Sequence, residues 1–117
     1  MRTRLTDLLG IEHPVMLAGM GGVSYHQLVA AVSEAGGIGT LGAGSMSPQV
    51  MRDEIATVAS MTDKPFGVDL LTAMPIDLVA EVQAIIDGGA RIFVAALGVP
   101  TEVVQLCHDH DVLVVNM

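Results

Sequence analysis

The chain has 117 residues, of which 51% are hydrophobic and only 15% charged, which excludes an intrinsically disordered chain and is enough for one domain with a core. Its 13 acidic and 5 basic residues give a formal net charge of −8, and only 3% of the residues are aromatic. A surface of this kind repels phosphate backbones and offers no aromatic stacking platform, so we expect no nucleic-acid partner.

The sequence also lacks the features of a membrane or secreted protein. Residues 1–14 contain no apolar segment of the kind found in signal peptides, and no apolar run reaches the roughly 18 residues of a membrane helix. Cys107 is the only cysteine, so no disulfide can form within the chain. We therefore expect a cytoplasmic protein with no membrane partner.

Short apolar runs alternate with longer helical patterns along the chain. The first run, residues 14–19, lies between a proline and a glycine and predicts a strand. A helix is predicted over residues 24–37, with Ser24 as its N-cap and Gly36 as its stop. Its apolar face is predicted to hold Leu28, Val29, Val32 and Ala35.

The second unit repeats this pattern. Residues 38–44 predict a strand, and Ser47 is the predicted N-cap of a helix over residues 48–62. Pro48 suits the first helical position, where its missing N–H has no consequence. The predicted apolar face of this helix holds Val50, Met51, Ile55 and Val58.

Three more strands and two more helices are predicted in the second half of the chain. The predicted strands cover residues 66–71, 91–98 and 112–115. The predicted helices cover residues 76–89, where Gly88 ends an apolar stripe of Leu78, Val82, Ile85 and Ile86, and residues 100–111.

Alternating strands and helices indicate βαβ units and a parallel sheet in a single α/β domain, residues 1–117. Two closures are open: a complete doubly wound sheet of five strands, or a (β/α)₈ TIM barrel, which typically needs about 250 residues. The chain ends at Met117, directly after the fifth predicted strand. This ending favours a barrel of which about the first five strands and four helices are present.

In both architectures, ligands bind beyond the carboxyl ends of the strands. The glycine-rich loop after the first predicted strand, AGMGG at residues 18–22, is an incomplete dinucleotide fingerprint and predicts either a tight turn or a ligand contact. Asp69, at the end of the third strand, points into this rim or caps the turn formed by residues 71–73. His13 lies at the opposite end of its strand and is predicted to be structural, whereas His26 is predicted to be a surface residue first and a ligand contact second.

The cluster of Cys107, His108 and His110 is not predicted to bind metal. On a helix these three side chains point in different directions, so a buried thiol with two exposed imidazoles is the favoured interpretation. The sequence contains no metal motif and no Ser/His/Asp set, and we name no metal ligand.

Four segments, in this order, carry a resemblance to a known family: HPVMLAGMGGVS, AAVSEAGGIGTLGAG, TDKPFGVDL and LGVP. Residues 3–117 thereby resemble the nitronate monooxygenase family, also called 2-nitropropane dioxygenases. The resemblance implies a (β/α)₈ barrel that binds FMN at its carboxyl rim and oxidises alkyl nitronates with O₂. Related flavin enzymes with this scaffold are enoyl reductases that use NAD(P)H.

The resemblance also implies site residues. Ala18, Gly19, Met20 and Gly21 match the family's loop whose backbone lies against the flavin. Asp69 stands where family members usually have an asparagine that hydrogen-bonds FMN. An ionised carboxylate only accepts hydrogen bonds, for example from the ribityl hydroxyls or the flavin N3–H, and near N1 or the phosphate it would disfavour an anionic reduced flavin. The family's catalytic histidine motif follows the fifth strand, so we name no catalytic residue.

Three functions are therefore considered. The first is an FMN-dependent monooxygenase that oxidises a nitronate with O₂. The second is an NAD(P)H-dependent flavin reductase of enoyl-ACP or enoyl-CoA thioesters. The third is a non-enzymatic half-barrel, either an inactive fragment or an assembly module. A homo-oligomer is left open for all three.

Overall fold

The computed structural model describes residues 1–117. It contains five helices and four strands. The helices are α1 (Arg4–Leu9), α2 (His26–Glu34), α3 (Pro48–Met61), α4 (Leu78–Asp87) and α5 (Thr101–Asp109). The strands are β1 (Gly39–Gly42), β2 (Phe66–Leu71), β3 (Ile92–Ala96) and β4 (Leu113–Asn116). None of the helices is both long and apolar enough to cross a membrane.

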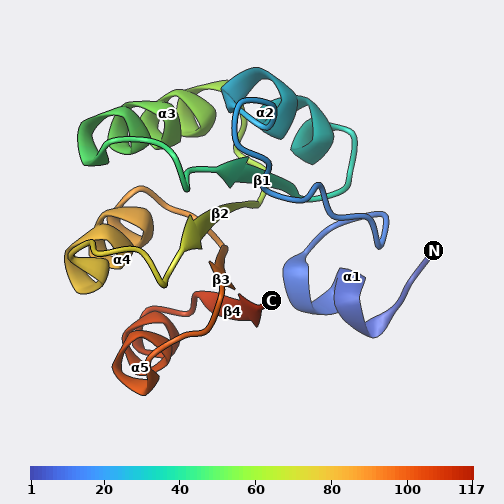
Figure 1. Ribbon diagram of the computed structural model, residues 1–117. Helices are drawn as coiled ribbons and strands as arrows, with labels where there is room; N and C mark the ends of the chain where they lie inside the picture. Colours follow the sequence, from blue (N-terminus) through green and yellow to red (C-terminus); the bar gives the residue numbers. More distant parts are fainter.

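The four strands form one parallel sheet in chain order, β1-β2-β3-β4. Helices α2 to α5 follow one another in an arc outside these strands, whereas α1 lies across from that arc (Figure 1). A doubly wound sheet would reverse its strand order and carry helices on both faces, whereas a TIM barrel winds in one direction inside a helical layer. The structure is therefore an arc of a (β/α)₈ barrel, and the doubly wound alternative is wrong.

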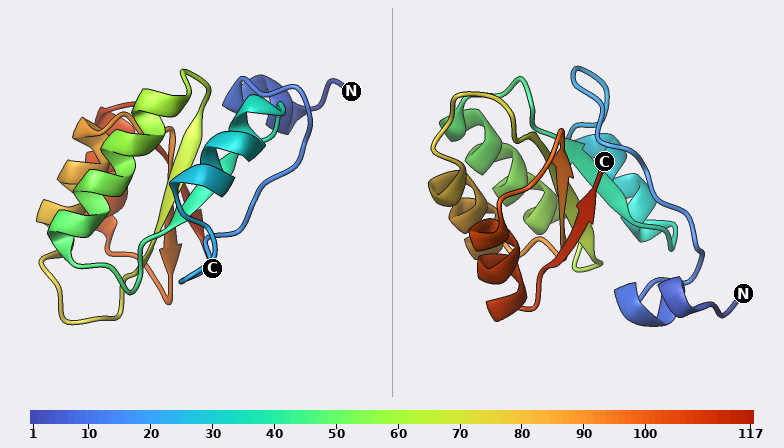
Figure 2. Two further views of the ribbon diagram at one scale, coloured as in Figure 1. Left: turned by 90° about the horizontal axis from the view of Figure 1, so that it is seen from above. Right: turned by 60° about the horizontal axis from the view of Figure 1, so that its bottom comes forward.

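The first predicted strand is much shorter than expected. Within residues 14–19, Met16 forms a single parallel bridge with Ile38. The Ile38 N–H donates to the carbonyl of Val15 and the Ile38 carbonyl accepts from Leu17 N–H. After this bridge the chain leaves the sheet and forms a loop at the arrowhead end of the strands (Figure 2, right). Pro14, which has no N–H, cannot extend the ladder in the other direction.

Apolar side chains pack on both faces of the sheet. The larger cluster lies between the strands and helices α2 to α5 and includes Val68, Phe93 and Val103. A second cluster, on the inner face, joins Leu9 of α1 to the sheet residues Ile38, Ile92 and Val94. Burial on both faces explains why the strand sequences do not alternate between polar and apolar residues.

Local signals predicted some helix ends correctly and others incorrectly. Helix α3 begins at Pro48, with the Ser47 hydroxyl accepting from Val50 N–H at 3.3 Å, as predicted, although Val50 itself is exposed. Gly88 is the C-cap of α4, also as predicted. Helix α2, however, begins at His26 without a side-chain cap from Ser24.

The predicted apolar face of α2 is also partly wrong. Leu28 is exposed, and the buried residues of this helix are Val29, Ala30 and Ser33. The helix turns this face toward β1 and α3, and the buried Ser33 hydroxyl bonds backbone groups there. A polar residue therefore occupies a position that hydrophobic periodicity alone does not identify.

Candidate functional site

Asp69 lies on the inner face of the sheet, near the carboxyl ends of the strands. It is opposite Gly42 of β1 and Val94 of β3, and residues paired in this way share one face of a sheet. Val94 belongs to the inner cluster, so this face is the one turned away from α3 to α5. The side chain nevertheless has little contact with solvent, since Asp69 is only 7% exposed.

The glycine-rich loop covers this carboxylate. A Cβ atom placed on Gly19 would lie 2.4 Å from the Asp69 Cβ and 2.7 Å from its Oδ2, closer than real side chains approach. A Cβ atom on Gly42 would likewise lie 2.5 Å from the carbonyl oxygen of Met20. The loop thus packs against the sheet only because both positions are glycines. The structure therefore brings Gly19 and Met20, two of the predicted site residues, to Asp69.

The buried carboxylate has an unsatisfied oxygen. Asp69 Oδ1 has no hydrogen-bond partner, and desolvation by burial raises the pKa of Asp69 to about 6. The turn-capping interpretation requires backbone donors, but the Thr72 N–H donates to the carbonyl of Ala96 and the Met74 N–H to that of Leu71. A buried carboxyl oxygen without a partner is costly, and such groups are characteristic of binding and catalytic sites.

Thr40 is a second buried polar residue on the same face, and the sequence analysis did not identify it. Its Oγ1 has no partner, and Thr40 is opposite Gly67 in the register of β1 and β2. Gly67 precedes Asp69 by two residues, so Thr40 lies one layer deeper in the barrel than the carboxylate. A single polar residue within the short strand Gly39–Gly42 was the only signal in the sequence.

The histidines do not join this site. The His26 ring Nδ1 lies 2.8 Å from Glu54 Oε2 on α3, and the same oxygen accepts a hydrogen bond from the His26 backbone N–H at 3.0 Å. Glu54 therefore supplies the cap at the start of α2. His13 is exposed beside Glu12, with 3.8 Å between its ring Nε2 and the Glu12 Oε2.

The cysteine–histidine cluster has the predicted arrangement of a buried thiol and two exposed imidazoles. Cys107 is fully buried, and burial raises the pKa of its thiol. His108 and His110 are exposed, and no group of three or more potential metal ligands is present anywhere in the structure.

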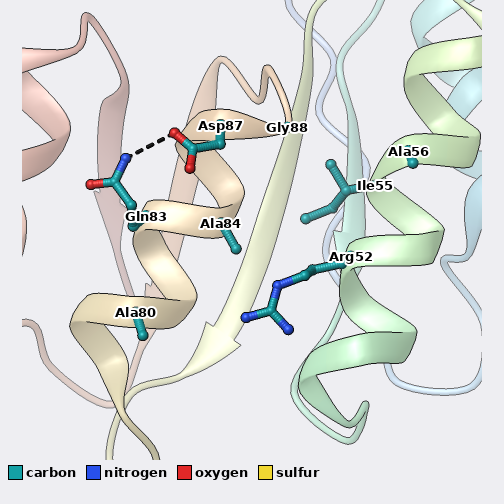
Figure 3. Close-up of a pocket in the computed structure, with 8 residues that line it drawn as sticks. All are labelled: Arg52, Ile55, Ala56, Ala80, Gln83, Ala84, Asp87 and Gly88. Atoms are coloured by element: carbon teal, nitrogen blue, oxygen red, sulfur yellow. Dashed lines mark hydrogen bonds between the residues drawn. The ribbon is translucent and has the colours of Figure 1, made fainter.

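A groove lies on the outer layer, between α3 and α4 (Figure 3). Arg52 extends from α3 into this groove, and on α4 the Gln83 amide donates to Asp87 Oδ1 at 2.9 Å. The remaining lining residues are small or aliphatic: Ile55, Ala56, Ala80, Ala84 and Gly88. This groove faces away from Asp69 and is not part of the candidate site.

A model of the nitronate monooxygenase family matches residues 2–117. The chain belongs to that family. The match covers almost the whole sequence and confirms the resemblance carried by the four sequence segments.

Curated relatives agree with this assignment. The chain is 36% identical over 115 residues to the (3aS,4S,5R,7aS)-5-hydroxy-7a-methyl-1-oxo-octahydro-1H-indene-4-carboxyl-CoA dehydrogenase of Mycobacterium tuberculosis, a match that covers 98% of this chain and 32% of the relative. It is 46% identical over 69 residues to a probable nitronate monooxygenase of Staphylococcus aureus, covering 59% of this chain and 19% of the relative. The chain thus spans about a third of the first relative and less of the second.

Two solved structures match nearly the whole chain. FabK from Thermotoga maritima has a TM-score of 0.90 at 37% identity, covering 99% of this chain and 37% of that one. Nitroalkane oxidase from Streptomyces ansochromogenes has a TM-score of 0.85 at 28% identity, covering 97% and 42%. These matches confirm the TIM-barrel fold class, and the family's members are oxidoreductases.

Proposed function

We propose that this chain is the amino-terminal part of an FMN-dependent barrel enzyme that oxidises alkyl nitronates with O₂. The observation that supports this most directly is the buried Asp69 Oδ1, which has no partner in the protein and lies at the rim where barrels bind ligands. The small residues of the glycine loop beside it would let a flat ring approach the protein backbone. Membership of the nitronate monooxygenase family supplies the reaction class.

The residues present fit a flavin. The backbone of residues 18–21 would hold one side of the group, and Asp69 Oδ1 would accept from it a hydrogen bond that no protein donor now provides. When bound, FMN supplies the redox chemistry. Because burial raises the pKa of Asp69 to about 6, this carboxyl group is mostly ionised at pH 7 and accepts a hydrogen bond, whereas below pH 6 it also donates one.

A thioester reductase is the second candidate. The 36% identical relative from Mycobacterium tuberculosis is named as a dehydrogenase of a carboxyl-CoA compound, so a member of this family acts on a CoA ester. This supports the alternative of an NAD(P)H-dependent flavin reductase of enoyl thioesters. An assembly module without activity is the third candidate, and a downstream histidine motif in the coding sequence would exclude it.

Anaerobic reduction of the full-length protein separates the two enzymatic candidates. The flavin absorbance is followed after addition of a nitronate or, separately, of NADH. Bleaching by the nitronate alone supports the monooxygenase, whereas bleaching by NADH followed by reoxidation with an enoyl thioester supports the reductase. Failure to bind any flavin contradicts both.

Substitution of Asp69 tests the contact itself. Asp69→Ala is expected to weaken FMN binding by about 1–3 kcal/mol, the scale of one hydrogen bond to a charged group. Asp69→Asn keeps an acceptor, adds a donor, and is expected to retain the flavin and favour its anionic reduced form. Unchanged FMN affinity in Asp69→Ala would contradict the proposed contact.

We also propose a cytoplasmic location, because the single cysteine is a free buried thiol, as expected in a reducing compartment. The small-molecule partners of the full-length protein would be a nitronate and O₂, or a thioester and NAD(P)H. Oligomerisation would be measured on the same full-length protein.

A further inference from the structure

We propose that Ser24 is a positioning residue that holds the cofactor loop, residues 18–21, in its binding conformation; this inference rests on the proposed flavin site. Ser24 does not touch that site itself. It acts through Met20, the central residue of the loop.

The Ser24 hydroxyl is bonded to both polar backbone groups of Met20. Its Oγ accepts from Met20 N–H at 2.6 Å and donates to the Met20 carbonyl at 3.1 Å. The Ser24 backbone N–H also donates to that carbonyl, at 3.0 Å. Ser24 is fully buried, so water does not compete for these bonds.

The same residue ties the loop to the sheet. The Gly42 N–H, at the end of β1, donates to the Ser24 carbonyl at 3.0 Å. Gly42 lies directly beneath the Met20 backbone and is opposite Asp69 in the register. Ser24 therefore fixes Met20 over the strand end next to the unpaired carboxylate.

The Ser24 hydroxyl forms no hydrogen bond outside the loop. Its position before α2 predicts an N-cap, but Glu54 from α3 accepts the first helical N–H instead. Both hydrogen bonds of the hydroxyl go to Met20. The residue is thus specialised for the conformation of the loop rather than for starting the helix.

The chain contains a matched control, Ser33. Its hydroxyl is also buried and also joins two backbone groups, donating to the Pro65 carbonyl at 2.7 Å and accepting from Gly39 N–H at 3.0 Å. Ser33 lies in α2 next to the amino end of β1, whereas Ser24 bonds Gly42 at the carboxyl end. Ser24→Ala and Ser33→Ala therefore remove the same chemistry from opposite ends of one strand.

The first measurement is amide hydrogen exchange in the flavin-free full-length protein. In Ser24→Ala the Met20 amide is expected to exchange at least about tenfold faster, because its only acceptor is lost. The Gly39 amide is expected to respond only to Ser33→Ala. Unchanged exchange at Met20 in Ser24→Ala would overturn the proposal.

The second measurement is FMN affinity. Ser24→Ala is expected to raise the dissociation constant about tenfold, whereas Ser33→Ala leaves it unchanged even though both variants lower the unfolding temperature. Equal affinity losses in the two variants would assign Ser24 a general structural role and overturn the proposal. If Ser24→Ala does not fold, Ser24→Cys replaces it, because cysteine has a similar volume but forms only weak hydrogen bonds. The same rise in the FMN dissociation constant is expected for that variant.

These outcomes are separate from those of the proposed function. A wild-type protein that binds no flavin contradicts the flavin site, while the exchange rate of Met20 still reports whether Ser24 holds the loop. A wild-type protein that binds flavin, with an unaffected Ser24→Ala, contradicts only the role of Ser24.

Discussion

At each end of β1, a buried serine hydroxyl joins two backbone groups. Ser33 does so at the amino end, between Pro65 and Gly39, and Ser24 does so at the carboxyl end, where both bonds go to Met20. The two ends differ in what lies beside the serine. At the carboxyl end the neighbouring carboxyl group of Asp69 keeps an oxygen without a partner.

This difference indicates that the amino end of β1 is built for stability and the carboxyl end for binding a ligand. The Ser33 hydroxyl links α2 to β1 and to the segment before β2 by hydrogen bonds, as expected of a residue that only stabilises the fold. Near the carboxyl end, the protein buries a polar oxygen at a cost that a ligand could offset. Gly19→Ala and Asp69→Asn, each with a matched control, test this contrast. Smaller effects are expected for Glu54→Ala, which tests the cap of α2, and for His108→Ala, which tests the cysteine–histidine cluster.

Gly19→Ala is expected to have the largest effect on the carboxyl end. Its Cβ would lie 2.4 Å from the Asp69 Cβ, so the loop or the strand must move. We expect FMN binding by the full-length protein to weaken about 10- to 100-fold, since overpacking typically costs about 1–3 kcal/mol. Equilibrium titration with FMN measures the change.

Gly37→Ala is the matched control for crowding. Its Cβ would lie 2.8 Å from the Val15 carbonyl, at the amino end of the barrel. We expect it to lower the unfolding temperature with less effect on FMN affinity. An equal loss of FMN affinity in both variants would remove the contrast between the ends.

Asp69→Asn is expected to change the pH dependence of stability. Burial raises the pKa of Asp69 from 3.8 to about 6, so the folded state binds the proton more tightly than the unfolded state does. The wild-type protein therefore loses up to about 3 kcal/mol of folding free energy as the pH rises through this range, and Asp69→Asn does not.

Urea denaturation of the flavin-free protein at pH 4 and pH 8 measures this effect. The stability of Asp69→Asn relative to wild type should be greater at pH 8 than at pH 4. The matched change Asp53→Asn, at an exposed position of α3, should show no such trend. An Asp69→Asn variant that tracks the wild type at both pH values would show that the carboxylate is well solvated.

Glu54→Ala is expected to destabilise the start of α2. It removes the acceptor of the His26 N–H and the partner of the His26 ring, and loss of a helix cap costs about 1–2 kcal/mol. Asp53→Ala removes an exposed carboxylate from the adjacent position and should cost less than about 0.5 kcal/mol. Chemical denaturation compares the two variants, and equal costs would argue against the cap.

His108→Ala is expected to have the smallest effect. The imidazole is exposed at the end of α5 and belongs to no group of potential metal ligands. Stability should change by less than about 0.5 kcal/mol. Calorimetric titration with Zn²⁺ should show no binding that depends on His108, and a zinc affinity lost in the variant would contradict the structural role given to this cluster.

Features that depend on neighbouring residues could be predicted from the sequence. The strand Phe66–Leu71 was predicted with its observed bounds, and helix α3 begins at Pro48 after its Ser47 cap because both signals act within one turn. The alternation of apolar runs and helical patterns correctly predicted a parallel sheet. The position of Asp69 in its predicted strand was enough to place it near the carboxyl rim of the sheet.

Tertiary structure decided which polar groups are paired. The Ser24 hydroxyl, a helix cap by sequence, bonds Met20 because Glu54, 28 residues from His26 in the chain, caps α2 instead. The first predicted strand forms only one bridge because the loop beyond it is held over Gly42. The missing partner of Asp69 likewise depends on the loop that covers it. Local sequence determines how each segment folds. Burial and hydrogen-bond pairing depend instead on groups brought together from distant parts of the chain, and the candidate site is defined by that burial and pairing.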